Sequence, residues 1–366
     1  MADNDLYQAM GGTAACRELS VAFYALVKRD PLLRPFFPGK TLTCAIEEFA
    51  AFLIQFLGGP SEDSQRRWWL SLRESHQRFK IGPKERDAWM KNMVKALDEA
   101  QIEEPVRKAL HDVFARSSAY VVNQGPALPV AEGVRDEIAR RWDSQLRLDE
   151  AVAAIRRGDA DRAITLAKTC DRTVLTGLLA LMIGSGHGVL LEFVQETLTR
   201  DPALIRERYA GRTLLHKASG EGSLTIVELL LRLGADPNAA DGGGHTPLYS
   251  VGNECKVAGA GKVVHALVRA GAKVDAHDGV KHCTALHMAA RRGNVLVAEA
   301  LLDCGADIEA RDTLAETPLR RSVNCNKTEV AALLLSRGAD RHSKGSKGLT
   351  PLLAARTPAM KRLLHQ

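Results

Sequence analysis

The 366-residue sequence predicts an all-α protein built from two unlike parts. Aromatic residues divide the chain, because residues 1–125 hold 3 Trp, 8 Phe and 3 Tyr, which is 14 of the 18 aromatics. Apolar residues recur at helical spacing in the first part, and a motif of about 33 residues repeats in the second. We therefore expect separate domains at 1–125 and 147–366, with a linker and connecting helix at 126–146.

The composition excludes several classes of protein. A hydrophobic content of 45% excludes a disordered chain, and a net charge of +6 is too small for an obligate nucleic-acid binder. Seven irregularly spaced cysteines without a CxxC pair disfavour a disulfide scaffold or zinc ribbon and favour the cytoplasm. The start has neither a basic nor an apolar run, so we expect no signal peptide. The apolar stretch Val174 to Val194 is broken by glycines, which predicts two short helices and no membrane span.

Residues 5–124 have the pattern of helices joined by short loops. Apolar residues recur at spacings of 4, 3 and 4 in one expected helix, and a later helix repeats the pattern; the two sets are Ala45, Phe49, Phe52, Phe56 and Trp89, Met93, Ala96. Prolines and glycine pairs punctuate the segment at Gly11-Gly12, Pro31, Pro38, Gly58-Gly59, Pro60, Pro83 and Pro105.

The second part repeats a Thr-x-Leu tripeptide. Its copies are 33, 38, 33 and 33 residues apart and begin at Thr213, Thr246, Thr284, Thr317 and Thr350. Each Thr is expected to cap a helix, with Pro tolerated in the first turn and Gly in a left-handed conformation after a second helix. The longer spacing predicts a four-residue insertion near Val251–Lys262.

The best copy is Thr284-Ala285-Leu286-His287-Met288-Ala289-Ala290-Arg291-Arg292-Gly293-Asn294. This pattern resembles the ankyrin repeat over about 220 residues, with about six units, the first two degenerate, and a truncated cap at 346–366. The resemblance implies a solenoid with short hairpin loops that engages a protein partner. It also implies that His216 and His287 bond neighbouring repeats, in preference to a metal-site role. The basic tips at 281–282 and 341–344 are interpreted as solvated, with an acidic partner as the alternative.

Residues 1–125 contain two histidines, His76 and His111, and His111 is interpreted as an exposed residue of the last helix. Around His76 stand motifs that together resemble the group II truncated haemoglobins over residues 5–124; these are Gly11-Gly12, Phe23-Tyr24, Asp30-Pro31-Leu32-Leu33-Arg34, Phe36-Phe37-Pro38, Gly58-Gly59-Pro60 and Arg86-Asp87-Ala88-Trp89. The resemblance implies a 2-over-2 helical sandwich around haem b. Haem needs bulky apolar walls and an axial imidazole, and this segment offers both.

The resemblance assigns roles to individual residues. His76 matches the proximal iron ligand, and Tyr24 and Trp89 match the donors that hydrogen-bond a bound diatomic gas. Five further positions match the wall of the haem pocket: Phe37, Ala45, Phe49, Phe52 and Phe79. A small Ala45 in place of a distal histidine leaves Tyr24 and Trp89 as the donors. The alternative for these two aromatics is a plain core role.

Three features depart from the family pattern. Phe37 stands where many members carry Tyr, which removes one distal hydroxyl. Ser75 stands where a basic residue is common, and Arg73 or Arg78 is the expected substitute for contact with a haem propionate. Trp68-Trp69 replaces a polar segment and has no assigned role.

The sequence therefore predicts a haem protein that binds O₂, NO or CO, with ankyrin repeats that engage a protein partner, as a gas- or redox-responsive interaction protein. The alternative is a haem enzyme, an NO dioxygenase or peroxidase, localised by the ankyrin part. That reading needs a separate reductase, because no flavin or NAD fingerprint occurs here. A third reading is a scaffold that has lost haem. The cysteines Cys283, Cys304 and Cys325 are expected to be small buried residues.

Overall fold

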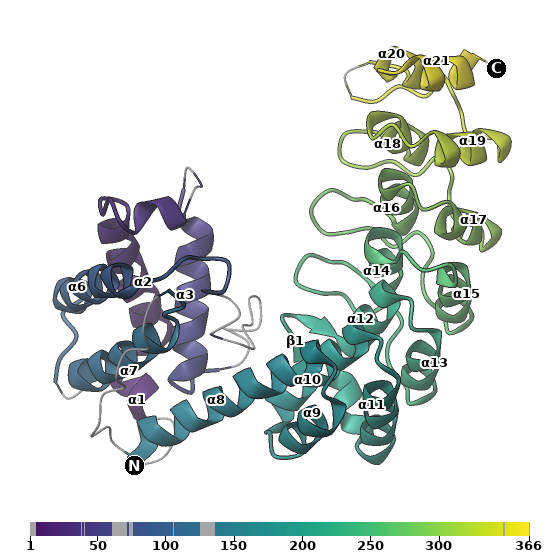
Figure 1. The fold of residues 1–366 in the computed structure, drawn as a ribbon. Coiled ribbons are helices and arrows are strands. Elements are labelled where there is room, and N and C mark those ends of the chain that lie inside the picture. The colour runs from purple at the N-terminus through teal and green to yellow at the C-terminus, as the bar shows by residue number, and fades with distance from the viewer. Residues whose placement is uncertain are drawn as a thin grey trace. The chain divides into compact units, whose positions relative to one another are not determined.

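A computed structural model describes residues 5–37, 39, 41–60, 72, 76–104, 106–124, 136–346 and 348–365. The chain divides into two compact units, Met1–Val174 and Leu175–Gln366. Helices dominate both units, which confirms the all-α prediction (Figure 1). Within the described ranges, no helix is both long enough and apolar enough to cross a membrane. The finer division at 125 and 146 stays a prediction.

The first unit begins with the helices that surround the aromatic residues. They are α1 (Asp5–Met10), α2 (Gly12–Val27), the 3-10 helix η1 (Arg34–Phe36), α3 (Thr43–Phe56), α6 (Pro83–Glu99) and α7 (Val106–Tyr120). Helix α2 packs on α3 and α6, and α6 packs on α7. The Ser20 hydroxyl fixes the first of these pairs, because it donates a hydrogen bond to the Ile46 carbonyl at 2.7 Å. Phe23, Phe114 and Met93 are fully buried between these helices.

Close packing explains why glycines occupy positions 58 and 59, directly after α3. A Cβ atom on Gly59 would lie 2.5 Å from the ring of Tyr7, so a larger residue would push α1 away from its place. Gly58 precedes it with a φ of 83°, in the left-handed region. The pair therefore ends α3 and lets α1 pack closely against the turn.

Two more helices of the first unit follow the aromatic segment, α8 (Asp136–Arg157) and α9 (Ala160–Ala167), and they pack on each other. Leu146 of α8 packs against the same core as Phe23 and Phe114. Helix α10 (Arg172–Ser185) contains the division between the two units.

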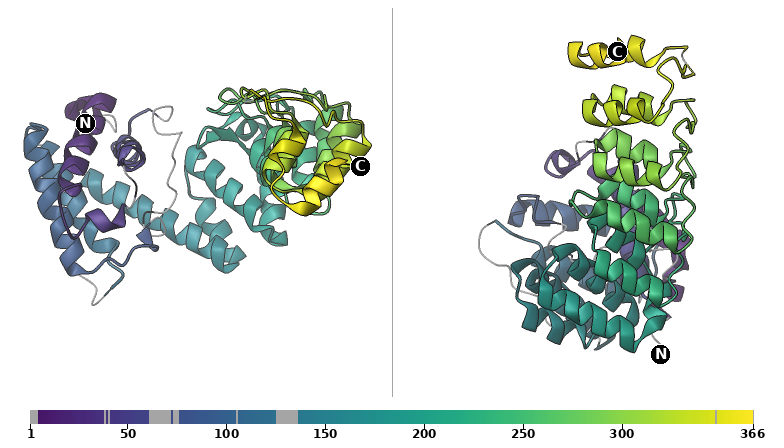
Figure 2. Two further views of the ribbon diagram at one scale, coloured as in Figure 1. Left: turned by 90° about the horizontal axis from the view of Figure 1, so that it is seen from above. Right: turned by 90° about the vertical axis from the view of Figure 1, so that its right-hand side faces the viewer.

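The second unit is a stack of helix pairs, in which the two helices of a pair lie side by side and successive pairs pack on one another (Figures 1 and 2). Its helices are α11 (Gly188–Arg200), η3 (Pro202–Arg206), α12 (Leu214–Glu221), α13 (Leu224–Arg232), α14 (Pro247–Glu254), α15 (Ala260–Arg269), α16 (Ala285–Arg292), α17 (Val295–Asp303), α18 (Pro318–Asn324), α19 (Thr328–Ser336), α20 (Pro351–Ala354) and α21 (Pro358–His365). A small antiparallel hairpin joins β1 (Arg208–Tyr209) to β2 (Arg212–Thr213).

The repeat chemistry is as predicted. The Thr246 side chain accepts a hydrogen bond from the Tyr249 amide at 3.2 Å, and Thr284, Thr317 and Thr350 cap α16, α18 and α20 in the same way. Gly305, which follows the second helix of its pair, has a φ of 84°. The extra residues lie between α14 and α15, as expected from the longer spacing.

Other predictions have mixed outcomes. The stretch Val174 to Val194 forms parts of two helices, α10 and α11, as expected. Cys283 is buried, but Cys304 is half-buried and the prediction is wrong for Cys325, which is exposed. Cys325 ends α18 as its C-cap residue, at a turn where little packs over the side chain.

Candidate functional site

The first unit contains a cavity of about 580 Å³ between α2, α3, α6 and α7 and the segments that join them. All eight residues predicted for the site line it: Tyr24, Phe37, Ala45, Phe49, Phe52, His76, Phe79 and Trp89. Sequence reasoning missed other lining residues, among them Phe36, Ile81 and Phe114. The volume lies within the roughly 300–1,000 Å³ usual for cofactor pockets, and the wall is mainly apolar.

The loop before α3 is held by the polar residues of its motif. Asp30 accepts hydrogen bonds from the amides of Leu32 and Leu33 at 2.9 and 3.1 Å, and from the Asn92 side chain of α6 at 2.6 Å. The Arg34 guanidinium donates to the Phe37 carbonyl. These contacts tie the loop to α6 and set the place of Phe37 in the cavity wall.

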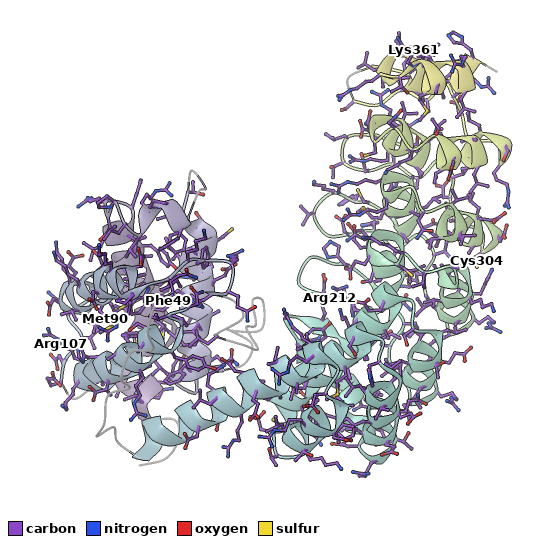
Figure 3. The ribbon with its side chains drawn as sticks, in the orientation of Figure 1. Phe49, Met90, Arg107, Arg212, Cys304 and Lys361 are labelled. Carbon is purple, nitrogen blue, oxygen red and sulfur yellow. The ribbon has the colours of Figure 1, made fainter. Side chains whose placement is uncertain are left out.

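Phe49 is the centre of the aromatic wall. Its ring lies 6.3 Å from that of Tyr24, 6.3 Å from Phe52, 6.0 Å from Phe114 and 6.4 Å from Trp89, measured between centroids. Figure 3 shows Phe49 inside the bundle of the first unit. Edge-on, tilted and stacked contacts of this kind each add about 0.5–1.5 kcal/mol beyond burial. The helical spacing of α3 predicted this face, whereas Phe114 belongs to a different helix.

His76 lies at one side of the cavity in a helical conformation. Its Nδ1 atom is 2.8 Å from the Leu72 carbonyl oxygen, four residues earlier. Because a carbonyl only accepts, Nδ1 carries the proton and the lone pair of the neutral ring is on Nε2. Burial lowers the pKa of His76, and Arg78 adds to this, so the ring is neutral at pH 7. A neutral imidazole with its lone pair on Nε2 is the form that coordinates iron.

Two hydrogen-bond donors line the cavity among the aromatic rings. Tyr24 is 8% exposed, and burial, with the Glu48 carboxylate, raises the pKa of its phenol, so the hydroxyl stays protonated. Trp89 carries an indole N–H, which only donates. Among the described residues, none makes a hydrogen bond with either group, so both donors stay available to a ligand.

Charged side chains also line the cavity. Arg78 and Arg86 are the cations among the described lining residues, and the Arg78 guanidinium lies 4.7 Å from the centroid of the Phe79 ring. Arg86 donates to the Ser118 hydroxyl at 3.3 Å and pairs with Asp87 at 2.9 Å. Arg78 is one of the two substitutes that the sequence suggested for a propionate contact. The other, Arg73, lies outside the described residues, as do Ser75, Trp68, Trp69 and the linker residues 125–135.

A buried carboxylate that sequence reasoning missed lies next to the histidine segment. Asp149 of α8 is 5% exposed, and its Oδ1 accepts from the Leu72 amide at 3.0 Å and from the Gln145 side chain at 2.8 Å. The available signal was a charge on the apolar face of a helix, beside Leu148 and Val152. Its partner is 77 residues away in sequence, so the signal did not identify the contact.

The histidines of the second unit have a different setting. The Nδ1 atom of His216 accepts from the Thr213 amide at 3.2 Å, and Nε2 lies 2.9 Å from the His245 carbonyl in the next repeat. His287 bonds Thr284 and the Glu316 carbonyl in the same way. Both ring nitrogens are thus used within the repeats, which confirms the structural role. His111 is an exposed residue of α7, also as predicted.

Comparison with known proteins separates the same two parts. Residues 5–123 match the family model for bacterial-like globins, and residues 198–248 and 254–345 match models for ankyrin repeats. The group 2 truncated hemoglobin YjbI of Bacillus subtilis (strain 168) is 33% identical over 124 residues, 34% of this chain and 92% of that protein. Human ankyrin repeat and SOCS box protein 16 is 34% identical over 163 residues, 42% of this chain. Human neurogenic locus notch homolog protein 1 is 35% identical over 148 residues, 40% of this chain.

The fold and these matches define a globin joined to ankyrin repeats. The chain belongs to the bacterial-like, truncated globin family through its N-terminal part, and ankyrin repeats form its C-terminal part. Membership of the globin family implies haem and a gas ligand, and ankyrin repeats imply a protein partner. The chain spans 35% of the human SOCS box relative and 6% of the notch homolog, so those likenesses concern the repeats.

Proposed function

We propose that residues 1–125 bind haem b and, with it, O₂, NO or CO, and that His76 is the residue that would hold the iron. The observation that carries this proposal is the hydrogen bond of Nδ1 to the Leu72 carbonyl at 2.8 Å, in a cavity of about 580 Å³ lined by aromatic rings. The tautomer, the volume and the apolar wall all fit the group. When bound, haem b supplies an iron centre that takes the diatomic gas.

Each of the chain's own residues has a defined task in this proposal. His76 stays neutral and presents the Nε2 lone pair, and Tyr24 and Trp89 donate hydrogen bonds to a gas ligand that gains negative charge. Ala45 leaves space where a larger residue would fill the distal side. Phe37, Phe49, Phe52 and Phe79 exclude water and confine the flat ring. Arg78 supplies a cation for a propionate.

The repeats, at 147–366 in this proposal, engage a protein partner in the cytoplasm. Support comes from the stacked helix pairs, which expose hairpin tips along one edge of the array. Apolar side chains stand exposed in these tips, with Val280 at 70% and Leu314 at 49% exposure. The whole chain then works as a gas- or redox-responsive interaction protein, in which the ligand state of the globin alters partner binding.

Absorption spectroscopy of the purified full chain tests the haem assignment. We expect a Soret band in the wild type or after addition of haemin, and its loss in His76→Ala. His111→Ala is the matched control, because His111 is exposed on α7, and it should keep the band. A wild type that stays colourless with haemin, or a His76→Ala variant with an unchanged spectrum, contradicts the proposal.

Two further measurements separate signalling from catalysis. Partner capture with the ferric, ferrous and CO-bound chain should give different yields if the globin controls the repeats. Equal yields in all three states argue against a responsive function. Sustained NO consumption with a supplied reductant would instead identify the haem enzyme.

A further inference from the structure

Helix α8 reaches the segment that carries the axial histidine, although it follows the stretch matched by the globin family, which ends at residue 123. Leu146 of α8 packs against the globin core. Asp149, one turn further on, is 5% exposed and accepts a hydrogen bond from the Leu72 amide at 3.0 Å. The helix is therefore held at this place by both an apolar and a polar contact.

A carboxylate is costly to bury, so its contacts must compensate for lost hydration. Gln145 donates a second hydrogen bond to the same oxygen of Asp149 at 2.8 Å. Gln145 also lies on α8, one turn before the aspartate, so it orients the carboxylate toward the histidine segment. A pair of donors at one oxygen makes the position of the carboxylate specific.

Residue Leu72 links this carboxylate to the imidazole. Its amide donates to Asp149, and its carbonyl accepts from Nδ1 of His76 at 2.8 Å. The plane of the imidazole depends on where that carbonyl lies, because a hydrogen bond to Nδ1 sets both the tautomer and the ring orientation.

We propose that Asp149 is a positioning residue for the axial histidine, which it holds in place through the backbone of Leu72. The inference rests on the haem function proposed above. It makes the electronic and binding properties of the iron depend on α8, the helix through which the chain passes on its way to the repeats. A ligand state that alters His76 would act on the same contact in the reverse direction.

Substitutions in the full chain test this assignment. In Asp149→Ala, the hydrogen bonds from Leu72 and Gln145 are lost, so the iron–histidine stretching band in the resonance Raman spectrum should move to lower frequency and broaden. Haem transfer to apomyoglobin should be about tenfold faster, at the lower end of what lost supporting contacts cost a metal ligand. In Asp149→Asn, the amide oxygen still accepts from Leu72, so transfer should stay close to the wild-type rate with a smaller band shift from the lost charge.

Glu150→Gln is the matched control. Glu150 is the next residue of α8, is exposed, and pairs with Arg162 at 2.7 Å. It should leave both the Raman band and the transfer rate unchanged. Nitrogen NMR of the haem-free chain adds a readout without the cofactor: His76 should be protonated at Nδ1 in the wild type and a mixture of tautomers in Asp149→Ala.

The outcomes separate this inference from the haem assignment. A wild-type Raman band and transfer rate in Asp149→Ala, with haem lost in His76→Ala, overturns the role of Asp149 alone. The same changes in Glu150→Gln as in Asp149→Ala also overturn it, because the effect would then belong to charge on α8 in general. If Asp149→Ala does not fold by circular dichroism, Asp149→Leu decides, because leucine fills the buried site but cannot accept from the Leu72 amide. A wild-type Raman band in that variant refutes the proposal.

Discussion

The cavity histidine of the first unit, His76, and a repeat histidine of the second, His216, carry the proton on opposite nitrogens. In the first unit, Nδ1 of His76 donates to the Leu72 carbonyl, which leaves the lone pair on Nε2. In the second unit, Nδ1 of His216 accepts from the Thr213 amide, so Nε2 carries the proton and donates to the next repeat. The same side chain is therefore prepared for coordination in one unit and for a structural bridge in the other.

The cores of the two units are built from different side chains. The first unit packs rings such as Phe49 and Trp89 around a cavity, whereas the second fills its repeats with Leu, Val and Ala between closely stacked helices. Aromatic rings enclose a large space without collapsing into it, and small side chains let thin repeats approach one another. The contrast teaches that the aromatic skew of the sequence reflects different interiors, one with rings around a cavity and one with small aliphatic side chains between stacked helices.

Acid should weaken the second unit through its buried bridges, and this is the largest effect we expect. Burial lowers the pKa of His216 to about 4, from 6.5 in the unfolded chain. As the pH falls from 6.5 to 4, the imidazole takes up a proton in the unfolded chain but stays neutral in the folded one. The free energy of unfolding, which is at its full value above pH 6.5, therefore falls by about 3 kcal/mol. Urea unfolding at pH 7 and at pH 4 measures this loss in the free energy of unfolding. The stability advantage of wild type over His216→Asn should shrink by that amount, and an advantage that is independent of pH contradicts the assignment.

Removal of a bridge at neutral pH should cost somewhat less. His287→Ala leaves the Thr284 amide and the Glu316 carbonyl without their partner, which should lower the free energy of unfolding by about 2 kcal/mol. His342→Ala, at an exposed turn, is the control and should cost nothing measurable. In the haem-free chain, His76→Ala should cost less than His287→Ala, because His76 bonds a carbonyl only four residues earlier, whereas His287 joins two repeats. If all three variants lowered the free energy of unfolding equally, the repeat histidines would have no bridging role that sets them apart from His76.

The contacts that sequence reasoning anticipated are mainly local. The repeat spacing indicated that Thr284 caps the helix that it begins, and the resemblance to ankyrin repeats implied the role of His287, three residues later. The eight cavity residues were anticipated as one site because several motifs of a known family were read together; their roles toward haem remain predictions. Asp149 was missed because its contact joins residues 77 apart.

The contact made by Arg320 between repeats could not be predicted from the repeat pattern. It occupies the place of the bridging histidine in its repeat, and its guanidinium donates to the carbonyls of Leu349 and Thr350 at 3.0 and 2.5 Å. A histidine at this place is part of the repeat pattern, and an arginine is not. Only the structure shows that a longer side chain makes the equivalent contact between repeats.

The donors of the distal side should have a moderate effect on ligand binding. Tyr24→Phe removes one hydrogen bond and keeps the ring contacts with Phe23 and Phe37 at 5.1 and 5.3 Å. Dissociation of O₂ should be up to about tenfold faster, which is the worth of one such bond. Stopped-flow measurement of the rate tests this, with Tyr7→Phe as a control whose hydroxyl instead bonds Thr13. An unchanged rate in Tyr24→Phe would make Tyr24 a plain core aromatic.

Surface ion pairs should contribute least, and equally in both units. Arg162 pairs with Glu150 at 2.7 Å in the first unit, and Arg337 pairs with Asp303 at 2.7 Å in the second. All four side chains are more than a third exposed, so solvent screens each pair. Arg162→Ala and Arg337→Ala should each cost about 0.5 kcal/mol and lose that effect in high salt. If Arg162→Ala or Arg337→Ala lowered the free energy of unfolding as much as His287→Ala, exposed ion pairs would matter as much as buried hydrogen bonds. The contrast between the units would then not rest on their buried polar contacts.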